Sequence, residues 1–324
     1  MDRRLDLEIA QLIGEPINIQ LPVPVALAEI ADTATAEPGD HVWRLQDLDE
    51  NVDIVLNVDP NGVMTPVKRT PLVDVELTFS GLNSKLEYVL VEDVLNKIDT
   101  NALARRKASI TRGMDKAELK IILDALLTPT TSVFPASQVG GFAVTIASGD
   151  DIYDVFMMAK HGIEDYGDNY SALCGSTVKE RIDTYDKDQE TTFHYNLNLV
   201  DRLNKVGITV RKIFGQVSRV TNEAQTPLLD PKKMILVARD STIASGKPIE
   251  FVRRKISPDI AKSMGADVDT AQRALIVGLT PVNVDVSGTT QNVLGYSVFG
   301  YESIVMCVKN PKAIATADLT SILS

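Results

Sequence analysis

The side chains that could perform chemistry in this chain are few and lie apart in the sequence. Its only two cysteines are Cys174, between a leucine and a glycine, and Cys307, in an apolar run. Two cysteines cannot form a disulfide framework, and such a count is typical of a reducing cytosol. We interpret both as small buried hydrophobes rather than nucleophiles. The three histidines, His41, His161 and His194, form no local set with a cysteine or with serine and aspartate.

Two groups of residues resemble metal ligands, but neither has the full set of ligands that a metal site needs. His161 and Glu164 have the i, i+3 spacing of a metal-binding helix pair, but such sites need two pairs and this chain has one. The sequence therefore favours a surface pair. An acidic cluster lacks the glycine and the glutamate spacing of a calcium loop, which favours a solvated acidic loop. Its members are Asp183, Asp186, Asp188 and Glu190.

Nucleotide-binding and catalytic motifs are also missing from the sequence. There is no GxGxxG, no GxxxxGK[ST], no GxSxG and no HExxH. We therefore assign no catalytic, cofactor-binding or metal-binding residue and expect no enzyme and no cofactor. An enzyme whose site is assembled from distant residues remains an alternative, and a pocket holding a perturbed ionisable pair would reveal it.

Composition limits the possible partners. The chain has 324 residues, of which 44% are hydrophobic, so one to three domains with a substantial core are expected. A net charge of −11 makes general nucleic-acid binding unfavourable. No apolar run approaches the ~20 residues that span a bilayer, and the N-terminus does not read as a secretory signal. We expect a soluble protein made in a cytoplasm, with no membrane partner.

The element that would position the rest is a long amphipathic helix over residues 91–112. Acidic residues at its start and basic residues at its end suit the helix dipole. Its apolar stripe has three-, four- and seven-residue spacing and consists of Val91, Val94, Leu95, Ile98, Ala102, Leu103 and Ile110. A second helix is expected over 114–127, with Asp115 and Glu118 as its capping box.

A β region precedes this helix. Alternating apolar residues predict strands over 52–58 and 73–79, a turn over 81–84 and a returning strand over 86–90. The region is either a small antiparallel sheet in a globular core or a two-stranded arm that projects from the body. An isolated hairpin is marginally stable, so a projecting arm would need a neighbouring molecule.

The two ends of the chain read differently. The first 41 residues look like an arm in which Pro16, Pro22 and Pro24 impose extended backbone. The stretch of small, polar residues after these prolines ends in a Pro-Gly turn. This stretch is either floppy or lies along something else, such as another subunit. Alternating elements over about 150–290 indicate a compact α/β unit. Its expected helices span 150–165, capped by Asp150, 177–185 and 195–206, and its strands 207–215 and 234–239, the latter paired with 248–253. Strands over 291–308 close a sheet.

This order of elements resembles the major capsid proteins of tailed bacteriophages, which have the Hong Kong 97-like fold. KRTPLVDVELTFSGLNSKLEYVLVEDVLNKIDTNALARR looks like the extended loop returning into the spine helix, and VLGYSVFGYESIVMCVKNPKAIATAD looks like the closing strands. The resemblance implies an α+β fold with an N-terminal arm at 1–45 and an extended β loop at 46–90. It also implies a peripheral domain at 91–148 and 292–324, which holds the spine helix, and an α/β axial domain at 149–291.

The function implied by this resemblance is structural. Members of the family self-assemble as pentamers and hexamers into an icosahedral shell that encloses double-stranded DNA without sequence-specific binding. Extended loops and N-terminal arms lie across neighbouring subunits. The partners implied are other copies of the chain, scaffolding and portal proteins and decoration proteins; the protein would be assembled in the host cytoplasm and located in the virion.

Two further classes remain as alternatives. An encapsulin, a cellular nanocompartment shell of the same architecture, would need a groove for a cargo peptide and a terminal helix in place of an extended arm. The three prolines of the arm disfavour such a helix. A tail-tube or baseplate protein would be mostly β, which the helices expected after residue 90 argue against.

Overall fold

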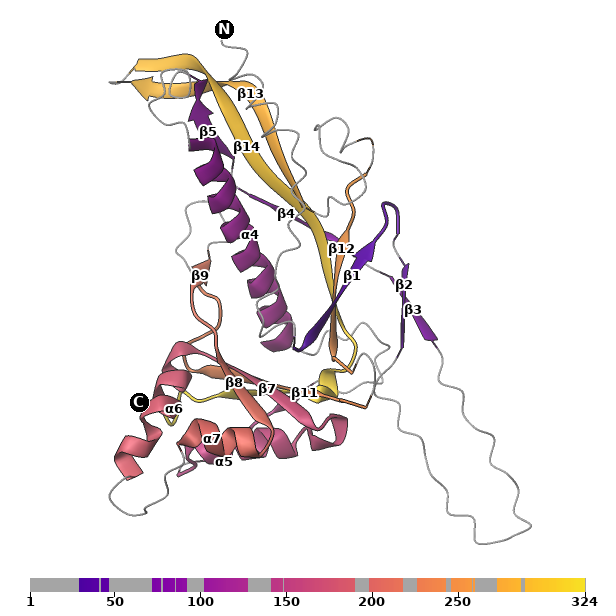
Figure 1. The fold of residues 1–324 in the computed structure, drawn as a ribbon, viewed down its shortest axis with the longest axis vertical. Coiled ribbons are helices and arrows are strands. Elements are labelled where there is room, and N and C mark those ends of the chain that lie inside the picture. The colour runs from indigo at the N-terminus through magenta and orange to yellow at the C-terminus, as the bar shows by residue number, and fades with distance from the viewer. Residues whose placement is uncertain are drawn as a thin grey trace, which may run out of the picture.

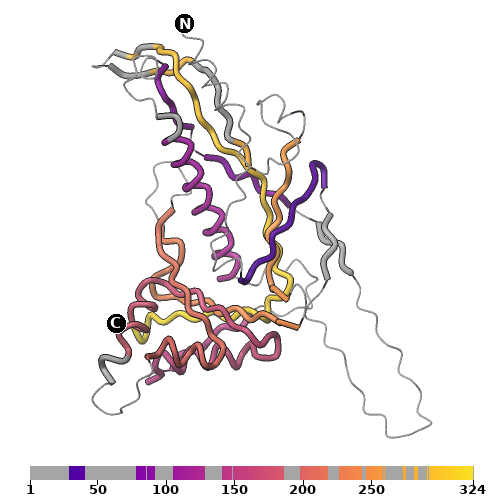
Figure 2. Tube along the Cα trace, in the orientation of Figure 1, coloured from indigo at the N-terminus to yellow at the C-terminus, as the bar shows by residue number. Residues whose placement is uncertain are grey.

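The computed structural model of the chain describes residues 29–40, 42–46, 72–76, 78–84, 86–91, 102–127, 141–147, 149–189, 198–217, 226–242, 246–257, 259, 273–286 and 289–323. These residues form a mixed α+β fold, as the sequence predicts. One long helix lies against a tall, open sheet, and a second sheet with a layer of shorter helices lies below it (Figure 1). Figure 2 shows the chain passing from the tall sheet into the second sheet near its C-terminal end, where residues 308–314 connect them.

The tall sheet is organised around one long strand, β14, Thr289–Val308. The strand β13, Arg273–Val286, pairs antiparallel with β14, and every residue of β13 takes part in this pairing. On its other side β14 pairs with β5, Glu87–Leu90, and then with β4, Ser80–Asn83. The strand β12, Ile249–Arg254, lies on the same side of β14 as β13 and pairs with the last residues of β14. The strand β1, Ala31–Ala36, completes the sheet by pairing in parallel with β12.

The helix α4, Ala102–Leu127, covers one face of this sheet. Its 26 residues span about 39 Å at the rise of an α-helix. Ile110 and Met114 pack on Val298 of β14, and the last turns of the helix pack on Phe251 of β12 and Ile304 of β14. Alternate residues of the sheet therefore meet one stripe of the helix, as the period of two and the period of 3.6 require.

The prediction of two helices in this region is wrong, because α4 continues through Gly113. Glycine in a helix interior costs about 0.5–1 kcal/mol relative to alanine. Here Gly113 is exposed, while Ile110 and Met114 on either side of it are buried, so packing outweighs the local cost. Asp115 and Glu118 consequently lie within the helix, and the predicted capping box is not one. Residues 92–101, the first part of the predicted helix, lie outside the described residues.

The second sheet has the strand order β6-β15-β11-β7-β8. Its strands are β6, Phe142–Ala143, β15, Ile314–Asp318, β11, Lys233–Arg239, β7, Asn169–Cys174, and β8, Ile208–Lys212. On one face lie α5, Ile152–His161, α6, Ser176–Gln189, and α7, Leu199–Lys205 (Figure 1). The other face meets the lower end of α4, so β11 is buried on both faces and its sequence MILVA is continuously apolar.

The smaller elements connect these parts. The 3₁₀ helices η1, Glu164–Tyr166, and η2, Pro311–Ala313, precede β7 and β15. The strands β9, Gln216–Val217, and β10, Thr226–Pro227, form a short pair that reaches α4. The strands β2, Val42–Gln46, and β3, Leu72–Glu76, pair with each other and, among the described residues, with no other strand. The strand predicted over 52–58 lies outside the described residues.

Several predicted elements of the α/β unit are confirmed. The inward residues expected for α5, among them Val155, Phe156 and Ile163, are fully buried. The helix α6 and the strands β8 and β11 are present where they were expected. The cap of α5 is Asp151, not Asp150: its carboxylate accepts from the backbone N–H of Asp154 at 2.9 Å, and the side chain of Asp154 accepts in return.

Other strand predictions are corrected. The expected turn over 81–84 is mostly the strand β4, and residues 31–36, expected to be floppy or to lie along something else, form β1 of the subunit's own sheet. The segment 248–253 forms β12, which pairs with β1 and β14 rather than with β11. One strand, β14, stands where several closing strands were expected. The turn at Pro38 and Gly39 is confirmed, and Gly39 has the positive φ of 96° that favours glycine.

Strand pairing groups the chain differently from the division expected from sequence. The strands β12 and β13 pair within the sheet beside α4, although the expected axial domain, 149–291, contained them. The strands β6 and β15 pair within the other sheet, although the peripheral segments 91–148 and 292–324 contained them.

The contact between α4 and β14 leads to a prediction about two glycines. A Cβ added at Gly300 would lie 2.5 Å from Met114 Sδ and 2.8 Å from Ile110 Cγ2, whereas one added at Gly113 meets nothing within 4 Å. We expect Gly300→Ala to destabilise the fold by about 1–3 kcal/mol through overpacking. Gly113→Ala, the matched control, should stabilise it by about 0.5–1 kcal/mol. Urea unfolding of both variants measures these changes, and equal effects would contradict the packing described.

Candidate functional site

Five charged side chains meet between α4 and the tall sheet, and all but Asp115, which is partly exposed, are buried. Asp115 and Glu118 come from the inner face of the helix. Arg253 comes from β12, Arg273 from β13 and Glu302 from β14. Arg273 and Glu302 lie directly opposite each other in the antiparallel pair. We call these five residues the charge cluster.

The geometry of the charge cluster is that of paired guanidinium and carboxylate groups. Arg253 donates to both oxygens of Glu118, at 2.9 Å from Nε and 2.9 Å from Nη2. Arg273 donates from Nε to Glu302 and from Nη1 to Asp115 at 2.7 Å, and its Nη2 lies 3.5 Å from Glu118. Arg273 thereby joins all three carboxylates. Bidentate pairs of this kind fix orientation as well as supplying energy.

Burial makes this cluster costly to disturb. Glu302 is 0% exposed and Arg273 3% exposed, and one oxygen of Glu302 has no hydrogen-bond partner among the residues that the structure describes. Because three carboxylates face two guanidiniums, full ionisation leaves one negative charge in excess. Burial and the nearby charge of Glu118 raise the pKa of Glu302 from 4.5 to about 7, although the hydrogen bond from Arg273 opposes the shift. The pKa of Arg273 is raised because its carboxylate partners outweigh its burial.

Sequence reasoning missed this cluster. Asp115 and Glu118 were interpreted as a cap, and Arg253 and Arg273 received no role. A usable signal was present, since Glu118 lies between the buried positions Met114 and Ile122 on the stripe of the helix. What the sequence does not show is that three distant strands bring their partners to that position. The cluster joins helix and sheet through ion pairs, and two of its acids, Glu118 and Glu302, are buried.

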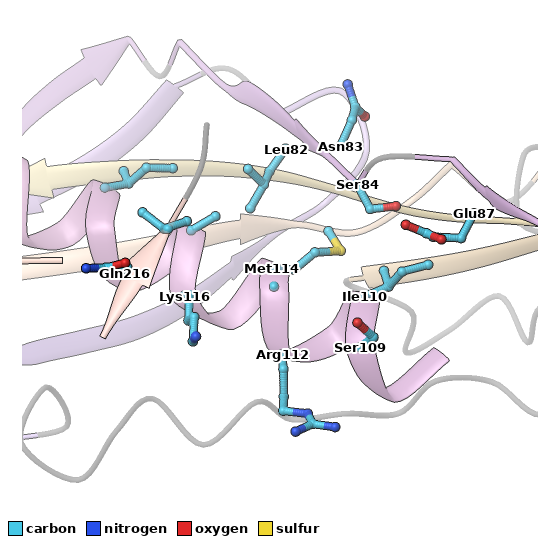
Figure 3. A pocket seen from close by; sticks show the side chains of 14 residues that line it. Leu82, Asn83, Ser84, Glu87, Ser109, Ile110, Arg112, Met114, Lys116 and Gln216 are labelled. Carbon is cyan, nitrogen blue, oxygen red and sulfur yellow. The ribbon is translucent and has the colours of Figure 1, made fainter. Parts of the chain in front are cut away.

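A groove runs along α4 beside the charge cluster, with a volume of about 730 Å³. Its walls are α4, the strands β4 and β9 and the start of β5 (Figure 3). Apolar side chains line much of it: Leu82, Ile110, Met114, Ala117, Ile121 and Val217. Arg112 and Lys116 lie on one long side, with Ser84 on the other (Figure 3). A surface of this kind suits an apolar segment of polypeptide better than a charged small molecule.

The two-stranded sheet of β2 and β3 is held at its base by Arg254. The guanidinium of Arg254 lies 3.8 Å from the centre of the Phe79 ring, and it also donates to the backbone carbonyl of Asp40. Asp40 precedes β2 and Phe79 follows β3, and Val42 pairs with Glu76, so one side chain contacts both strands at the same end of the pair. The adjacent Lys255 donates from its backbone N–H to Ala36 at 2.9 Å and pairs with Glu37.

Both cysteines are buried, as predicted. Cys174 lies in β7 and Cys307 in β14, and each is 0% exposed. Burial raises the pKa of each thiol to about 12. Because the thiolate is the nucleophile, neither side chain suits covalent catalysis at neutral pH.

The suspected metal ligands do not come together. His161 ends α5, Glu164 begins η1, and both are exposed. Asp183, Asp186 and Asp188 belong to α6, so the prediction of an acidic loop is wrong for these three; Glu190 lies outside the described residues. Asp183 forms an i, i+4 ion pair with Lys179. His41 and His194 also lie outside the described residues.

The described residues contain neither a metal-binding cluster nor a membrane-spanning helix. No group of three or more His, Cys, Asp or Glu side chains there could hold a metal ion. In the same ranges no helix is both long enough and apolar enough to cross a membrane.

Comparisons with known proteins bear on the fold. No protein-family model and no curated protein matches this sequence. Among solved structures, the capsid of an empty GTA particle is similar at 13% identity with a TM-score of 0.50, over 94% of this chain and 93% of that one. A phage-related protein from Bordetella bronchiseptica RB50 is similar at 9% identity with a TM-score of 0.50, over 96% of both chains. The resemblance to phage capsid proteins is therefore confirmed at the level of the fold.

The pairing of Arg253 with Glu118 leads to a prediction about stability. Arg253→Met leaves Glu118 buried without its bidentate partner and should cost about 3–5 kcal/mol. Adding Glu118→Met should restore part of that loss, because two apolar side chains need no partner. Lys120→Met, which removes a partly exposed i, i+4 pair with Asp124, serves as the control and should cost less than about 0.5 kcal/mol. Urea unfolding tests this, and a double variant less stable than Arg253→Met would contradict it.

The raised pKa of Glu302 leads to a prediction about pH. Between pH 4.5 and about 7 the folded protein keeps a proton that the unfolded chain has lost, so this group stabilises the fold fully below pH 4.5. Its contribution, on the order of 3 kcal/mol, is lost as the pH rises through 7. Glu302→Gln, which imitates the neutral carboxyl, should therefore gain stability relative to wild type as the pH increases. Unfolding curves between pH 4.5 and 8 measure this difference, and a difference independent of pH would refute the assignment.

Proposed function

We propose that this chain is a structural capsid protein that self-assembles, as pentamers and hexamers, into an icosahedral shell enclosing phage DNA. The observation that carries the proposal is the fold, which it shares over more than nine tenths of its length with the capsid of a GTA particle. The finer assignments rest on the geometry described above. In this proposal the protein belongs to the virion and is assembled in the host cytoplasm, with scaffolding, portal and decoration proteins as further partners.

The parts of the subunit take the following roles in the proposal. The helix α4 is the spine helix, and with the tall sheet it forms the peripheral domain. The sheet of β6, β15, β11, β7 and β8 with α5, α6 and α7 forms the axial domain. Residues 46–71, which lead from the end of β2 to the start of β3, are the part of the extended loop that would contact a neighbouring subunit. These boundaries follow strand pairing rather than sequence order, so 249–286 joins the peripheral domain and 314–318 the axial domain.

The two-stranded sheet supports an assembly role. The strands β2 and β3 lie to the side of both larger sheets (Figure 1), and Arg254 holds their base. A pair of strands without a third is marginally stable in water. A neighbouring subunit beneath it would supply the surface that the pair needs, by packing or by strand addition.

Two alternative functions, an encapsulin shell and an enzyme, would give different results in the assembly experiment described below. An encapsulin shell has the same architecture and would give small uniform shells without a scaffold. An enzyme would need a site with accessible reactive groups, whereas Glu302, the acid whose pKa is raised among the described residues, is fully buried.

The assembly role leads to a prediction about the extended loop. Replacing residues 49–69 by a short Gly-Ser connection should leave the melting temperature of the subunit nearly unchanged, because the described residues by themselves supply the hydrophobic clusters of both larger sheets. Shell formation should be lost, since the loop can no longer reach a neighbour. Size-exclusion chromatography and negative-stain electron microscopy, with and without crowding salt, compare the variant with wild type.

Closed shells, sheets or tubes from the wild type and none from the variant are expected. Shells of normal yield from the variant would contradict the role of the loop. A wild type that stays monomeric under every condition, also with a co-expressed scaffold, would contradict the capsid proposal itself.

A further inference from the structure

The segment that precedes the first described residue, Glu29, has a pattern of its own. From residue 17 to residue 27 every odd position is apolar: Ile17, Ile19, Leu21, Val23, Val25 and Leu27. The even positions are asparagine, glutamine, two prolines and alanine, and no charged residue occurs between Glu15 and Glu29. Alternation with period two describes an extended chain with one apolar face, and Pro22 and Pro24 favour extended backbone. Such a face needs an apolar surface to cover.

The described chain begins at one end of the groove. Ile30 is 1% exposed and belongs to the hydrophobic cluster formed by the last turns of α4, and Figure 1 shows β1 starting beside that end of the helix. Glu29 is held in turn by the side chains of Arg211 in β8 and Ser171 in β7. The burial of Ile30 and the contacts of Glu29 together determine where the residues before Glu29 must start. That point lies on the side of the molecule where β8 leads into β9.

The groove continues directly from that cluster. Leu82, Ala117, Ile121 and Val217 line the groove and also pack on the cluster that buries Ile30. From Ile121 to Ile110 the groove follows α4 for about 16 Å. Five residues of extended chain span about 16–17 Å. The few residues before Glu29 therefore have the length of the groove.

We propose that residues 23–28 of the same chain lie extended along the groove on α4, with Val23, Val25 and Leu27 facing its apolar floor. Leu27 is three residues from the anchored Ile30, so the local concentration of this segment at the groove is far above that of any second copy. The chemistry also fits. The rim offers donors from Arg112, Lys116 and Gln216, and a segment containing Pro24 presents backbone carbonyls with few N–H groups.

This proposal does not depend on the capsid function, because it concerns how one chain covers its own helix. It divides the N-terminal arm into two parts. Residues 23–28 belong to the subunit, and only residues before them remain for contact with another molecule.

Matched substitutions on the two faces of the segment test the proposal. Val25→Asp places a charge on the floor of the groove, whereas Ala26→Asp places the same charge on the opposite face. Hydrogen exchange followed by mass spectrometry should show the amides of residues 110–121 exchanging several-fold faster in Val25→Asp and unchanged in Ala26→Asp. Equal exchange in wild type and Val25→Asp, or equal acceleration in both variants, would overturn the proposal.

A cross-link identifies the occupant without changing the segment. A benzophenone side chain introduced at Lys116, on the rim, should link to residues 23–28 after illumination, whereas the same group at the exposed Glu180 of α6 should not. Mixing ¹⁵N-labelled and unlabelled chains separates the sources. Links within chains of one label support the proposal. Links between labels, links from Lys116 to any other segment, or none at all would overturn it.

Discussion

The structure depends on one long strand and the helix that lies across it. The strand β14 is a neighbour of β13, β5, β4 and β12, segments that come from three separate parts of the sequence. Because side chains alternate along a strand, a shift of one residue would turn its helix-facing residues away from α4. Gly300 allows Ile110 and Met114 to approach the strand closely, and Val298 packs on the same pair. The register of β14 thus determines where the helix can lie, and with it the position of the sheet below.

The buried charges reinforce that register. Apolar side chains on a helix can slide by one turn and still be buried, whereas the pairs of Arg273 with Asp115 and Glu302 exist in one alignment only. A buried ion pair adds little net stability compared with apolar residues of similar volume, and its best-documented use is to select one arrangement. We therefore regard the charge cluster as a device for alignment. Its excess acid explains why the free energy of unfolding should respond to pH near neutrality.

Beside the two larger sheets the chain has a pair of strands that no third strand joins among the described residues. Each of the two larger sheets packs in a hydrophobic cluster, whereas β2 and β3 pair with each other and have Arg254 at their base, in contact with Asp40 and Phe79. Rigid cores carrying an extension of this kind are suited to repeated assembly, because the extension can contact a neighbour while the fold of each subunit stays intact.

The sequence by itself determined the elements whose pattern is local. The stripe of α5, the buried strand β11 and the burial of Cys174 and Cys307 follow from periodicity and residue type, which neighbours in sequence decide. The order of elements was also enough to indicate the capsid fold.

Only the tertiary structure decided which strands pair and which charges meet. Residues 248–253 read as a strand in either sheet, and their pairing with β14 depends on contacts some fifty residues away in sequence. From the sequence, Gly113 and the acids Asp115 and Glu118 predicted a break in the helix. A glycine followed by residues with the spacing of a capping box is typical of one helix ending and another beginning. The packing of Ile110 and Met114 and the pairing of Glu118 with Arg253 override this local pattern. Local sequence patterns predict a helix or strand correctly when residues close in sequence determine its burial. They fail where the packing or charge partner of a residue comes from a distant part of the sequence.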